Sequence, residues 1–238
     1  MDNTGYVGLT RQVGLLAEMR TVANNIANMS TTGYRAEGVA FAEHVDALRR
    51  GPSLSMATAR GRLTDLSQGG VTHTGATFDL AIEGEGFFQV EGPDGPLLTR
   101  AGGFTPDPEG TLRTYDGRAV LDEGGAAVFV PPGATSVAIG ADGTISADGT
   151  PLGRIGVVVP EDPTSLIRRD GVAFDFEGGI VPSENARVMQ GALEDANVDP
   201  VSEIARMIEV QRAYELGQGL LDREDERIRS VIRTLSRT

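Results

Sequence analysis

Residues 23–35 read ANNIANMSTTGYR, and this stretch marks the end of a helix close to the beginning of the chain. Apolar residues keep helical spacing through its first half, although asparagine is a poor helix former because its side chain competes for backbone hydrogen bonds. Gly33 then supplies the residue type that most often ends a helix. We therefore predict a helix over about residues 5–29, after which the chain turns away.

The predicted N-terminal helix carries an apolar stripe. Leu9, Leu16 and Ala23 are seven residues apart, and Met19 and Ile26 follow the last two of them by three residues. This spacing is typical of the face with which a helix packs against another helix.

A clearer seven-residue repeat lies near the C-terminus. It consists of Met207, Tyr214, Leu221, Ile228 and Leu235, with Ile204, Val231 and Ile232 beside it. Asp199-Pro200 is a good helix start, because aspartate caps the first turn and proline fits the first helical position. We predict a helix over about residues 200–236, and the repeat indicates a coiled coil.

Residues 77–182 have a different texture, with short apolar runs separated by glycine-containing turn signals. Such runs predict strands and hairpins, so we expect a compact antiparallel β domain. We interpret Gly84-Glu85-Gly86 as a hairpin turn, since the remainder of a phosphate-binding loop is missing. Asp142-Gly143 and Asp148-Gly149 do not continue into a calcium loop and predict turns. Residues 39–48 allow a short helix before an extended connector.

Together these patterns predict an α+β fold, mainly β, in which an antiparallel β domain is flanked by long N- and C-terminal helices that pair as a coiled coil. We divide the chain into four segments. They are an N-terminal helical assembly segment (1–35), a partly extended connector (36–76), the Gly-rich antiparallel β domain (77–185) and a C-terminal segment with the long helix (186–238).

The composition argues against most kinds of chemical site. Cysteine is absent, which removes disulfides and thiolate chemistry, and neither His44 nor His73 stands near a run of metal ligands. Adjacent acids such as Glu161-Asp162 are expected to be solvated loop charges, because the chain holds 34 acidic residues. We therefore expect no catalytic, metal-binding or cofactor-binding site, and no enzyme activity.

The charge and the N-terminal sequence bear on partners and location. The net charge is −13, and residues 77–199 hold 21 acids against 7 arginines, so nucleic acid is not expected as a partner. The opening MDNTGYVGLTRQ lacks the basic and apolar regions of a Sec signal, and no apolar run approaches the ~18 residues of a membrane span. We expect neither a cleaved Sec signal nor direct membrane insertion.

Four segments carry a resemblance to a known family. Besides ANNIANMSTTGYR they are FDLAIEGEGFFQV (78–90), LLTRAGGFTPDPEGTLRTYDGRAVL (97–121) and QGALEDANVDPVSEIARMIEVQRAYE (190–215). Each resembles a signature of the flagellar rod and hook family, and the four occur in the family's order. Residues 125–182 match least and residues 36–76 only loosely.

The resemblance implies an axial structural subunit of the bacterial flagellum. Such proteins are exported unfolded through the flagellar type III apparatus, assemble with copies of themselves and with homologous subunits, and form the periplasmic rod that transmits torque from motor to hook. The length and the opening residues are most similar to proximal rod subunits. A distal rod subunit or another hook or rod subunit is the alternative, and a periplasmic cell-wall hydrolase is a remote one.

We predict that the terminal segments form the assembly interface. The asparagine amides would cap free carbonyls and bond adjacent helices, with simple fraying of the helix end as the alternative. The candidate interface residues are Leu9, Leu16, Met19, Ala23, Asn24, Asn25, Ile26, Asn28, Thr32, Gly33, Tyr34, Ile204, Met207, Gln211, Tyr214, Leu221, Ile228, Val231, Ile232 and Leu235.

Overall fold

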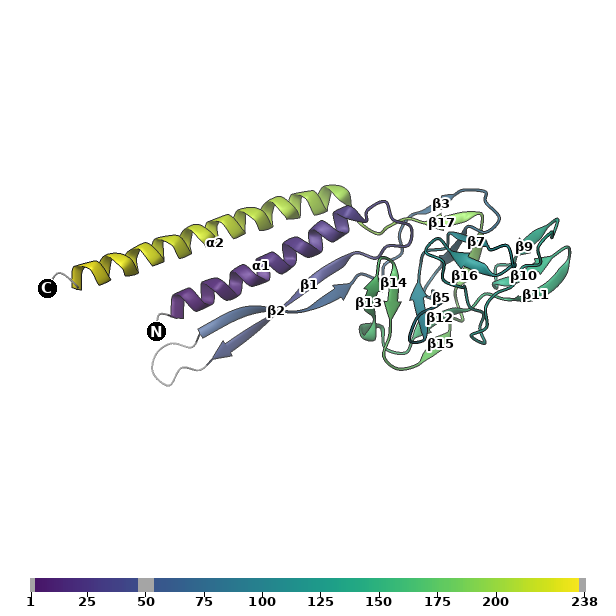
Figure 1. The fold of residues 1–238 in the computed structure, drawn as a ribbon, viewed down its shortest axis with the longest axis horizontal. Helices are drawn as coiled ribbons and strands as arrows, with labels where there is room; N and C mark the ends of the chain where they lie inside the picture. The colour runs from purple at the N-terminus through teal and green to yellow at the C-terminus, as the bar shows by residue number, and fades with distance from the viewer. Residues whose placement is uncertain (1–2, 47–53, 236–238) are drawn as a thin grey trace. The chain divides into compact units, whose positions relative to one another are not determined.

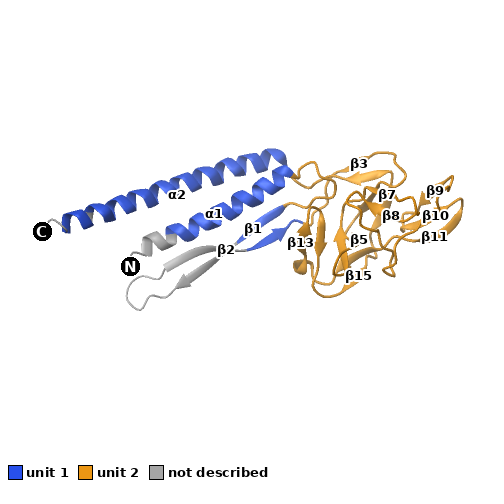
Figure 2. Ribbon diagram, in the orientation of Figure 1, with its two compact units in different colours: residues 1–27, 37–65, 199–238 blue, residues 28–36, 66–198 orange. Residues whose placement is uncertain are grey.

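The computed structural model describes residues 3–46 and 54–235 (Figure 1). The chain divides into two compact units, which are coloured separately in Figure 2. Unit 1 comprises residues 1–27, 37–65 and 199–238, and unit 2 comprises residues 28–36 and 66–198. Each unit is therefore built from segments that are far apart in the sequence.

Unit 1 combines a helix pair with a long hairpin. Its elements are α1 (Asn3–Ala27), β1 (Glu37–Asp46), β2 (Leu54–Thr64) and α2 (Pro200–Leu235). Within this unit α2 runs antiparallel beside α1, and the β1–β2 hairpin also packs against α1 (Figure 1). β1 and β2 pair antiparallel from Glu37 opposite Thr64 to Asp46 opposite Leu54, with a bulge at Ala40 and Phe41.

The local signals at the start of α2 are confirmed. Asp199 caps the helix, because its carboxylate accepts bonds from the Val201 amide at 3.1 Å and from the Ser202 hydroxyl at 2.6 Å. Pro200 is the first helical residue, and the helix continues to Leu235. The N-terminal helix ends at Ala27, two residues before the predicted position.

The predicted fold class, with two long helices paired as a coiled coil, is wrong. The structure is mainly β, with one long C-terminal helix of 36 residues and a shorter N-terminal helix of 25 residues. The helices touch, but Leu9 and Leu16 of the predicted stripe are 58% and 37% exposed instead of filling holes in α2. The hairpin is a second partner of α1, which the helical repeat could not reveal.

The short helix that residues 39–48 allowed is also wrong over the described part of that range. Residues Glu37–Asp46 form β1, because the following segment Leu54–Thr64 folds back and supplies an antiparallel ladder for them. Short apolar runs fit either a strand or a helix, so the pairing partner decides between them.

Unit 2 is a β domain of several small sheets. Its elements are β3 (Val71–His73), β4 (Leu80–Glu83), β5 (Phe87–Glu91), β6 (Pro96–Thr99), β7 (Phe104–Pro106), β8 (Leu112–Thr114), β9 (Val137–Ile139), β10 (Thr144–Ala147), β11 (Thr150–Arg154), β12 (Val157–Pro160), the 3₁₀ turn η1 (Pro163–Ser165), β13 (Ile167–Asp170), β14 (Ala173–Asp175), β15 (Ile180–Pro182), β16 (Arg187–Gln190) and β17 (Ala192–Glu194). The largest sheet has the antiparallel order β13-β14-β6-β5-β12-β15.

The turn predictions have different outcomes. Asp148 and Gly149 link the paired strands β10 and β11 with φ of 49° and 81°, as a two-residue hairpin requires. Gly84-Glu85-Gly86 joins β4 to β5, which belong to different sheets, so its assignment as a hairpin turn is wrong. Both glycines have positive φ, so the chain does turn at these residues as their type predicts, although the strands on either side do not pair.

The core of unit 2 lies between these sheets. Its main cluster includes Leu80, Phe88, Leu112, Val120 and Ile155, all at most 1% exposed. The rings of Phe88 and Phe104 meet edge to face with centroids 5.2 Å apart. A second cluster contains Phe87 and Phe174. These clusters hold β4 and β5 in place, and Arg100, described next, donates to backbone carbonyls at the end of β4.

Candidate assembly interface

Gly33 is the turn on which the segment 28–36 depends. It has φ of +69°, a conformation that side chains with a Cβ rarely adopt, and a Cβ there would lie 2.3 Å from the Ala101 backbone nitrogen. Its own amide donates to the Glu194 carbonyl at 2.7 Å. The glycine therefore allows its own backbone segment to approach the backbone at Ala101 closely inside unit 2.

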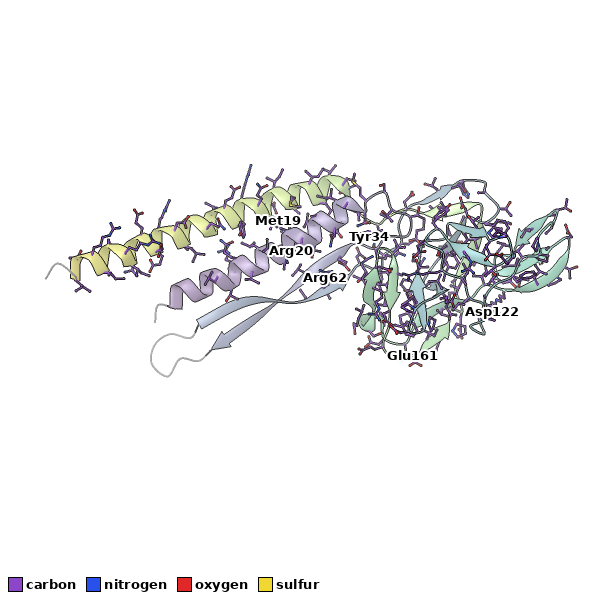
Figure 3. The ribbon with its side chains drawn as sticks, viewed as in Figure 1. Met19, Arg20, Tyr34, Arg62, Asp122 and Glu161 are labelled. Carbon is purple, nitrogen blue, oxygen red and sulfur yellow. The ribbon has the colours of Figure 1, made fainter. Side chains whose placement is uncertain are left out.

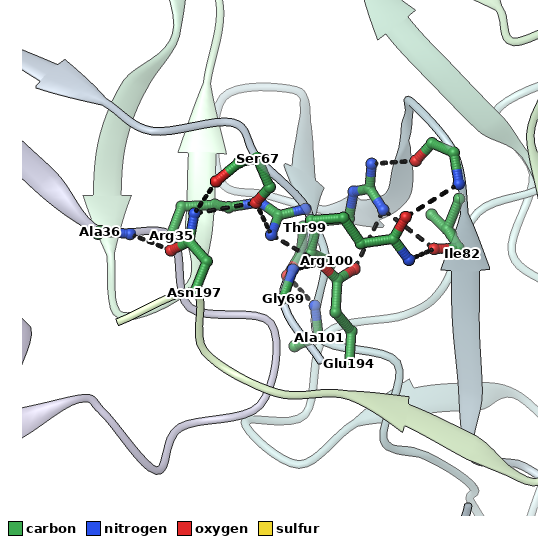
Figure 4. Close-up of polar contacts among 12 residues, drawn as sticks. Arg35, Ala36, Ser67, Gly69, Ile82, Thr99, Arg100, Ala101, Glu194 and Asn197 are labelled. Carbon is green, nitrogen blue, oxygen red and sulfur yellow. Dashed lines mark hydrogen bonds and ion pairs between the residues drawn. The ribbon is translucent and has the colours of Figure 1, made fainter. Parts of the chain in front are cut away.

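Directly after this turn a buried ion cluster forms, and Figure 4 shows its contacts. The Glu194 carboxylate lies 2.7 Å from Arg35 Nη1 and 3.0 Å from Arg100 Nη1. Arg35 and Glu194 have no exposed surface, and Arg100 is 3% exposed. Removing such charges from water is costly unless each is paired and hydrogen-bonded, so the cluster must be held in a defined geometry.

Backbone groups add hydrogen bonds to the cluster. Arg100 donates to the carbonyls of Ile82 at 3.2 Å and Gly84 at 2.6 Å, and the Gly69 amide donates to Glu194 Oε1 at 2.9 Å. Burial lowers the pKa of Arg100 to about 10, Arg35 acts in the same direction, and Glu194 opposes both. Arg100 therefore keeps its positive charge at neutral pH although it is buried.

Tyr34 and Asn197 add further contacts within unit 2, and the Asn197 amide donates to the Tyr34 carbonyl at 3.3 Å. Tyr34 is 2% exposed, and the Arg168 guanidinium lies 4.5 Å from the centre of its ring. The Ala36 amide donates to Asn197 Oδ1 at 2.6 Å, while Asn197 Nδ2 donates to the Ser67 carbonyl at 2.9 Å. Segments 28–36 and 194–198, about 160 residues apart, are therefore fastened to each other within unit 2.

In unit 1 the side chain of Asn25 joins the end of α1 to the start of β1. Its Nδ2 donates to the Glu37 carbonyl at 2.9 Å, and its Oδ1 accepts from the Glu37 amide at 3.0 Å. Asn25 is 1% exposed. The side-chain amide thus pairs with the first residue of β1 in the way a backbone strand would, which explains an asparagine at this helix end.

Side-chain hydrogen bonds and an ion pair join α1 and α2. Gln12 Nε2 donates to the Tyr214 carbonyl at 3.0 Å, and Arg206 Nε donates to Glu18 at 2.7 Å. This bond to Glu18 raises the pKa of Arg206 above its ordinary value. One apolar contact occurs where Leu221 lies against Gly8, since a Cβ on Gly8 would stand 2.8 Å from it.

The candidate interface residues divide by exposure. Within the chain's own units Asn25, Gly33 and Tyr34 are buried, whereas Met19, Ile26, Asn28, Thr32, Met207, Tyr214 and Leu221 are half-buried. Those left exposed are Leu9, Leu16, Ala23, Asn24, Ile204, Gln211, Ile228, Ile232 and Leu235. The side chain of Val231 lies outside the described residues.

The exposed members at the C-terminal end of α2, Ile228, Ile232 and Leu235, share a physical cause. α1 begins at Asn3 and Gly8 faces Leu221, so the last turns of the longer helix α2 extend past the part of α1 that the structure describes. Ile232 and Leu235 are accordingly 59% and 70% exposed. Side chains project from α2 along its length in Figure 3, where Met19 and Arg20 mark α1. A row of large apolar side chains in water is typical of a surface that another molecule covers.

Sequence reasoning missed the buried cluster of Arg35, Arg100 and Glu194. Each stands in a different one of the four quoted segments, at TTGYR, LLTRAGGF and QGALE, but an isolated arginine or glutamate ordinarily indicates a solvated surface position. The convergence of three distant motifs on one cluster is visible only in the folded unit.

Among the described residues, no group of three or more histidine, cysteine, aspartate or glutamate side chains is arranged to hold a metal ion. Neither helix, over its described length, combines the length and apolarity needed to cross a membrane. A β domain fastened by buried ion pairs, together with helices that present apolar side chains to water, defines a structural subunit built for assembly.

The comparisons with known proteins agree with this class. Residues 6–35 match the family described as flagella basal body rod protein, residues 81–147 match the flagellar hook protein FlgE/F/G D1 domain, and residues 189–234 match the flagellar basal body rod FlgEFG protein C-terminal family. These ranges contain Arg35, Arg100 and Glu194 respectively.

Full-length relatives are more specific. The chain is 38% identical to the flagellar basal-body rod protein FlgF of Caulobacter vibrioides, over 100% of this chain and 99% of the relative. It is 32% identical to FlgF of Mesorhizobium japonicum over 99% and 98%, and 30% identical to FlgG of Bacillus subtilis over 95% and 97%. The chain therefore belongs to the flagellar basal-body rod protein family, and within it to the FlgF group.

Proposed function

We propose that this rod subunit occupies the proximal rod of the flagellar basal body, where it joins copies of itself and homologous rod subunits and transmits torque from motor to hook. The observation that carries the proposal is the set of large apolar side chains on α1 and α2 that unit 1 leaves exposed. Leu9 is 58% exposed, and Ile204, Ile232 and Leu235 are 50%, 59% and 70% exposed.

The energetics favour assembly through these side chains. Apolar surface removed from water stabilises a contact by about 25 cal/mol per Å². Several such side chains in a row can offset the loss of motional freedom when subunits associate. The torque-bearing contacts would then involve residues of the predicted interface that the subunit itself does not bury.

A triple substitution tests the proposal directly. Ile228→Ser, Ile232→Ser and Leu235→Ser replace side chains that are 39%, 59% and 70% exposed, so the free subunit should keep its fold. We expect the variant to be missing from purified basal bodies and to fail to restore swimming in cells that lack the native chain. Deletion of residues 200–238 should have the same effect, since unit 2 contains none of them.

Leu152→Ser is the matched control, because Leu152 is a 38% exposed apolar residue of unit 2. It should be incorporated as well as the wild type. Basal bodies that contain the triple variant at the wild-type level would refute assembly through the exposed residues of α2.

A distal rod position is the second candidate, favoured by the 30% identity to FlgG of Bacillus subtilis over 95% of this chain. Labelling the subunit and locating it along the rod axis in basal-body images separates the two positions. A label next to the motor supports the proximal assignment, and a label next to the hook supports the distal one.

Further proposals concern delivery and chemistry. We propose export through the flagellar type III apparatus to the periplasmic rod. We also propose that the chain has no catalytic activity and does not bind nucleic acid, the last supported by the net charge of −13.

The division into segments 1–35, 36–76, 77–185 and 186–238 stays a prediction about which parts order independently. Limited proteolysis of the free subunit would test it.

A further inference from the structure

An open groove of about 750 Å³ lies in unit 1 between α2 and Arg11 of α1. We call it the arginine groove, because Arg11, Arg212 and Arg223 line it with a single acidic residue, Glu215. Its apolar part is supplied by Leu216 and Leu220, which are 77% and 56% exposed. The groove therefore combines a net positive charge with an uncovered apolar surface.

Among the residues that the structure describes, the three arginines have no acidic partner. Several other arginines of unit 1 are paired, such as Arg206 with Glu18 and Arg229 with Asp225. Across the described part of the chain, no carboxylate lies within ion-pair distance of Arg11, Arg212 or Arg223. Three unpaired guanidinium groups around one groove favour an occupant that brings carboxylates.

A complementary surface follows the groove on the same helix. Asp222 and Glu226 are exposed and stand four residues apart, so they share one face of α2. Neither has an ion pair in the part of unit 1 that the structure describes, whereas Asp225 between them is bound by Arg229 at 2.8 Å. This pair is the acidic counterpart of the arginine groove.

We propose that the arginine groove receives Asp222 and Glu226 of a second copy of the chain. The inference rests on the proposed function, since it names the partner surface of the assembling helices. Successive residues of a helix are rotated by about 100° around its axis. Around the axis of α2, the groove residues Arg212, Leu216 and Arg223 lie on average roughly a quarter turn away from the acidic pair. One α2 can therefore offer its acidic pair to one neighbour while its groove accepts that of another.

Such a contact has defined properties. It joins different surfaces of the two copies, so it adds subunits head to tail instead of closing a dimer. Along α2 the acidic pair lies about six residues after the centre of the groove. When the pair of one copy enters the groove of the next, the two α2 helices are therefore shifted relative to each other by roughly 9 Å along their axes. Because the charges lie at an exposed rim, association should weaken as salt is added.

The experiment is a charge exchange in the full-length chain. One variant carries Arg212→Glu and Arg223→Glu, and the other carries Asp222→Arg and Glu226→Arg. Arg20→Glu is the control, since Arg20 is an exposed arginine of α1 outside the groove. Sedimentation velocity over a range of concentrations, at low and high salt, measures association, and circular dichroism confirms that the helices are retained.

We expect the wild type and Arg20→Glu to form a concentration-dependent series of oligomers at low salt. Each charge variant alone should associate at least roughly tenfold more weakly than the wild type. An equimolar mixture of the two variants should recover association. The mixture also serves as the folding check, because a misfolded variant could not be rescued by its counterpart.

Other results would overturn the inference. They are a wild type that stays monomeric or stops at a dimer, charge variants that associate like the wild type, or a mixture that does not recover. Quantifying the variants in basal bodies separates this inference from the proposed function. Normal incorporation of both variants refutes the groove contact alone, whereas absence of the wild-type chain from the rod refutes the proposed function.

Discussion

Arg35 Nη1 lies 2.7 Å from Glu194 Oε1, and neither side chain has any exposed surface. The two residues close a loop of almost the whole of unit 2, since Arg35 follows α1 and Glu194 ends the last strand before α2. Bringing such distant segments together costs chain entropy, which the buried pair and its hydrogen bonds must offset. The cluster is therefore a fastening of unit 2 and not a surface feature.

Glu194→Gln should strongly destabilise unit 2. The substitution keeps the size of the side chain but leaves Arg35 and Arg100 as buried charges without a counter-charge, which typically costs about 3–5 kcal/mol. Hydrogen exchange of the full-length chain, read by mass spectrometry, should show faster exchange in β4, β5 and β17. Glu184→Gln, at an exposed site of the same unit, should leave exchange unchanged. Wild-type protection in Glu194→Gln would mean that the ion pairs contribute little.

Features that depend on neighbouring residues were predictable from the sequence. The start of α2 follows from Asp199 and Pro200, and the β10–β11 turn follows from Asp148-Gly149, because capping and turn geometry are local. The coiled coil failed because a helical repeat does not specify its partner, and α1 packs against a hairpin as well as against α2.

The fastening of unit 2 could not be predicted for a different reason. Arg35 and Glu194 are 159 positions apart, and an arginine or a glutamate in a single sequence carries no mark of burial. The exposure of the C-terminal end of α2 could not be predicted either, because it depends on where α1 begins opposite α2.

Asn25→Ala should destabilise unit 1, although alanine is the better helix former. The change removes both hydrogen bonds to the Glu37 backbone and leaves a buried amide and carbonyl unsatisfied, at a cost of about 1–3 kcal/mol. Thermal unfolding of the full-length chain, followed by circular dichroism, measures the effect. Arg20→Ala changes an exposed residue of the same helix and should be close to neutral. A stabilised Asn25→Ala would show that helix propensity outweighs these bonds.

Gly33→Ala should destabilise unit 2 for steric reasons. The left-handed conformation costs a residue with a Cβ about 1–2 kcal/mol, and the added methyl group would stand 2.3 Å from the Ala101 nitrogen, which belongs to rigid backbone. Gly61→Ala is the control, because nothing lies within 4 Å of its Cβ position. We expect a lower unfolding temperature for Gly33→Ala only. Equal unfolding temperatures for both variants would contradict a requirement for glycine at position 33.

The start of α2 should loosen in acid because Asp199 titrates. The bond from the Ser202 hydroxyl and then the bond from the Val201 amide lower the pKa of Asp199 below its ordinary value of 3.8. A carboxyl group whose pKa is lowered by folding stabilises the fold above 3.8, and this contribution is lost as pH falls through the folded pKa. The protection of the first turn of α2 against hydrogen exchange, measured relative to the intrinsic exchange rate at each pH, should therefore fall at acid pH in the wild type. Asp199→Asn retains a capping side chain that does not titrate, so its first turn should show less pH dependence. The same acid response in both proteins would assign the loosening to other carboxyl groups.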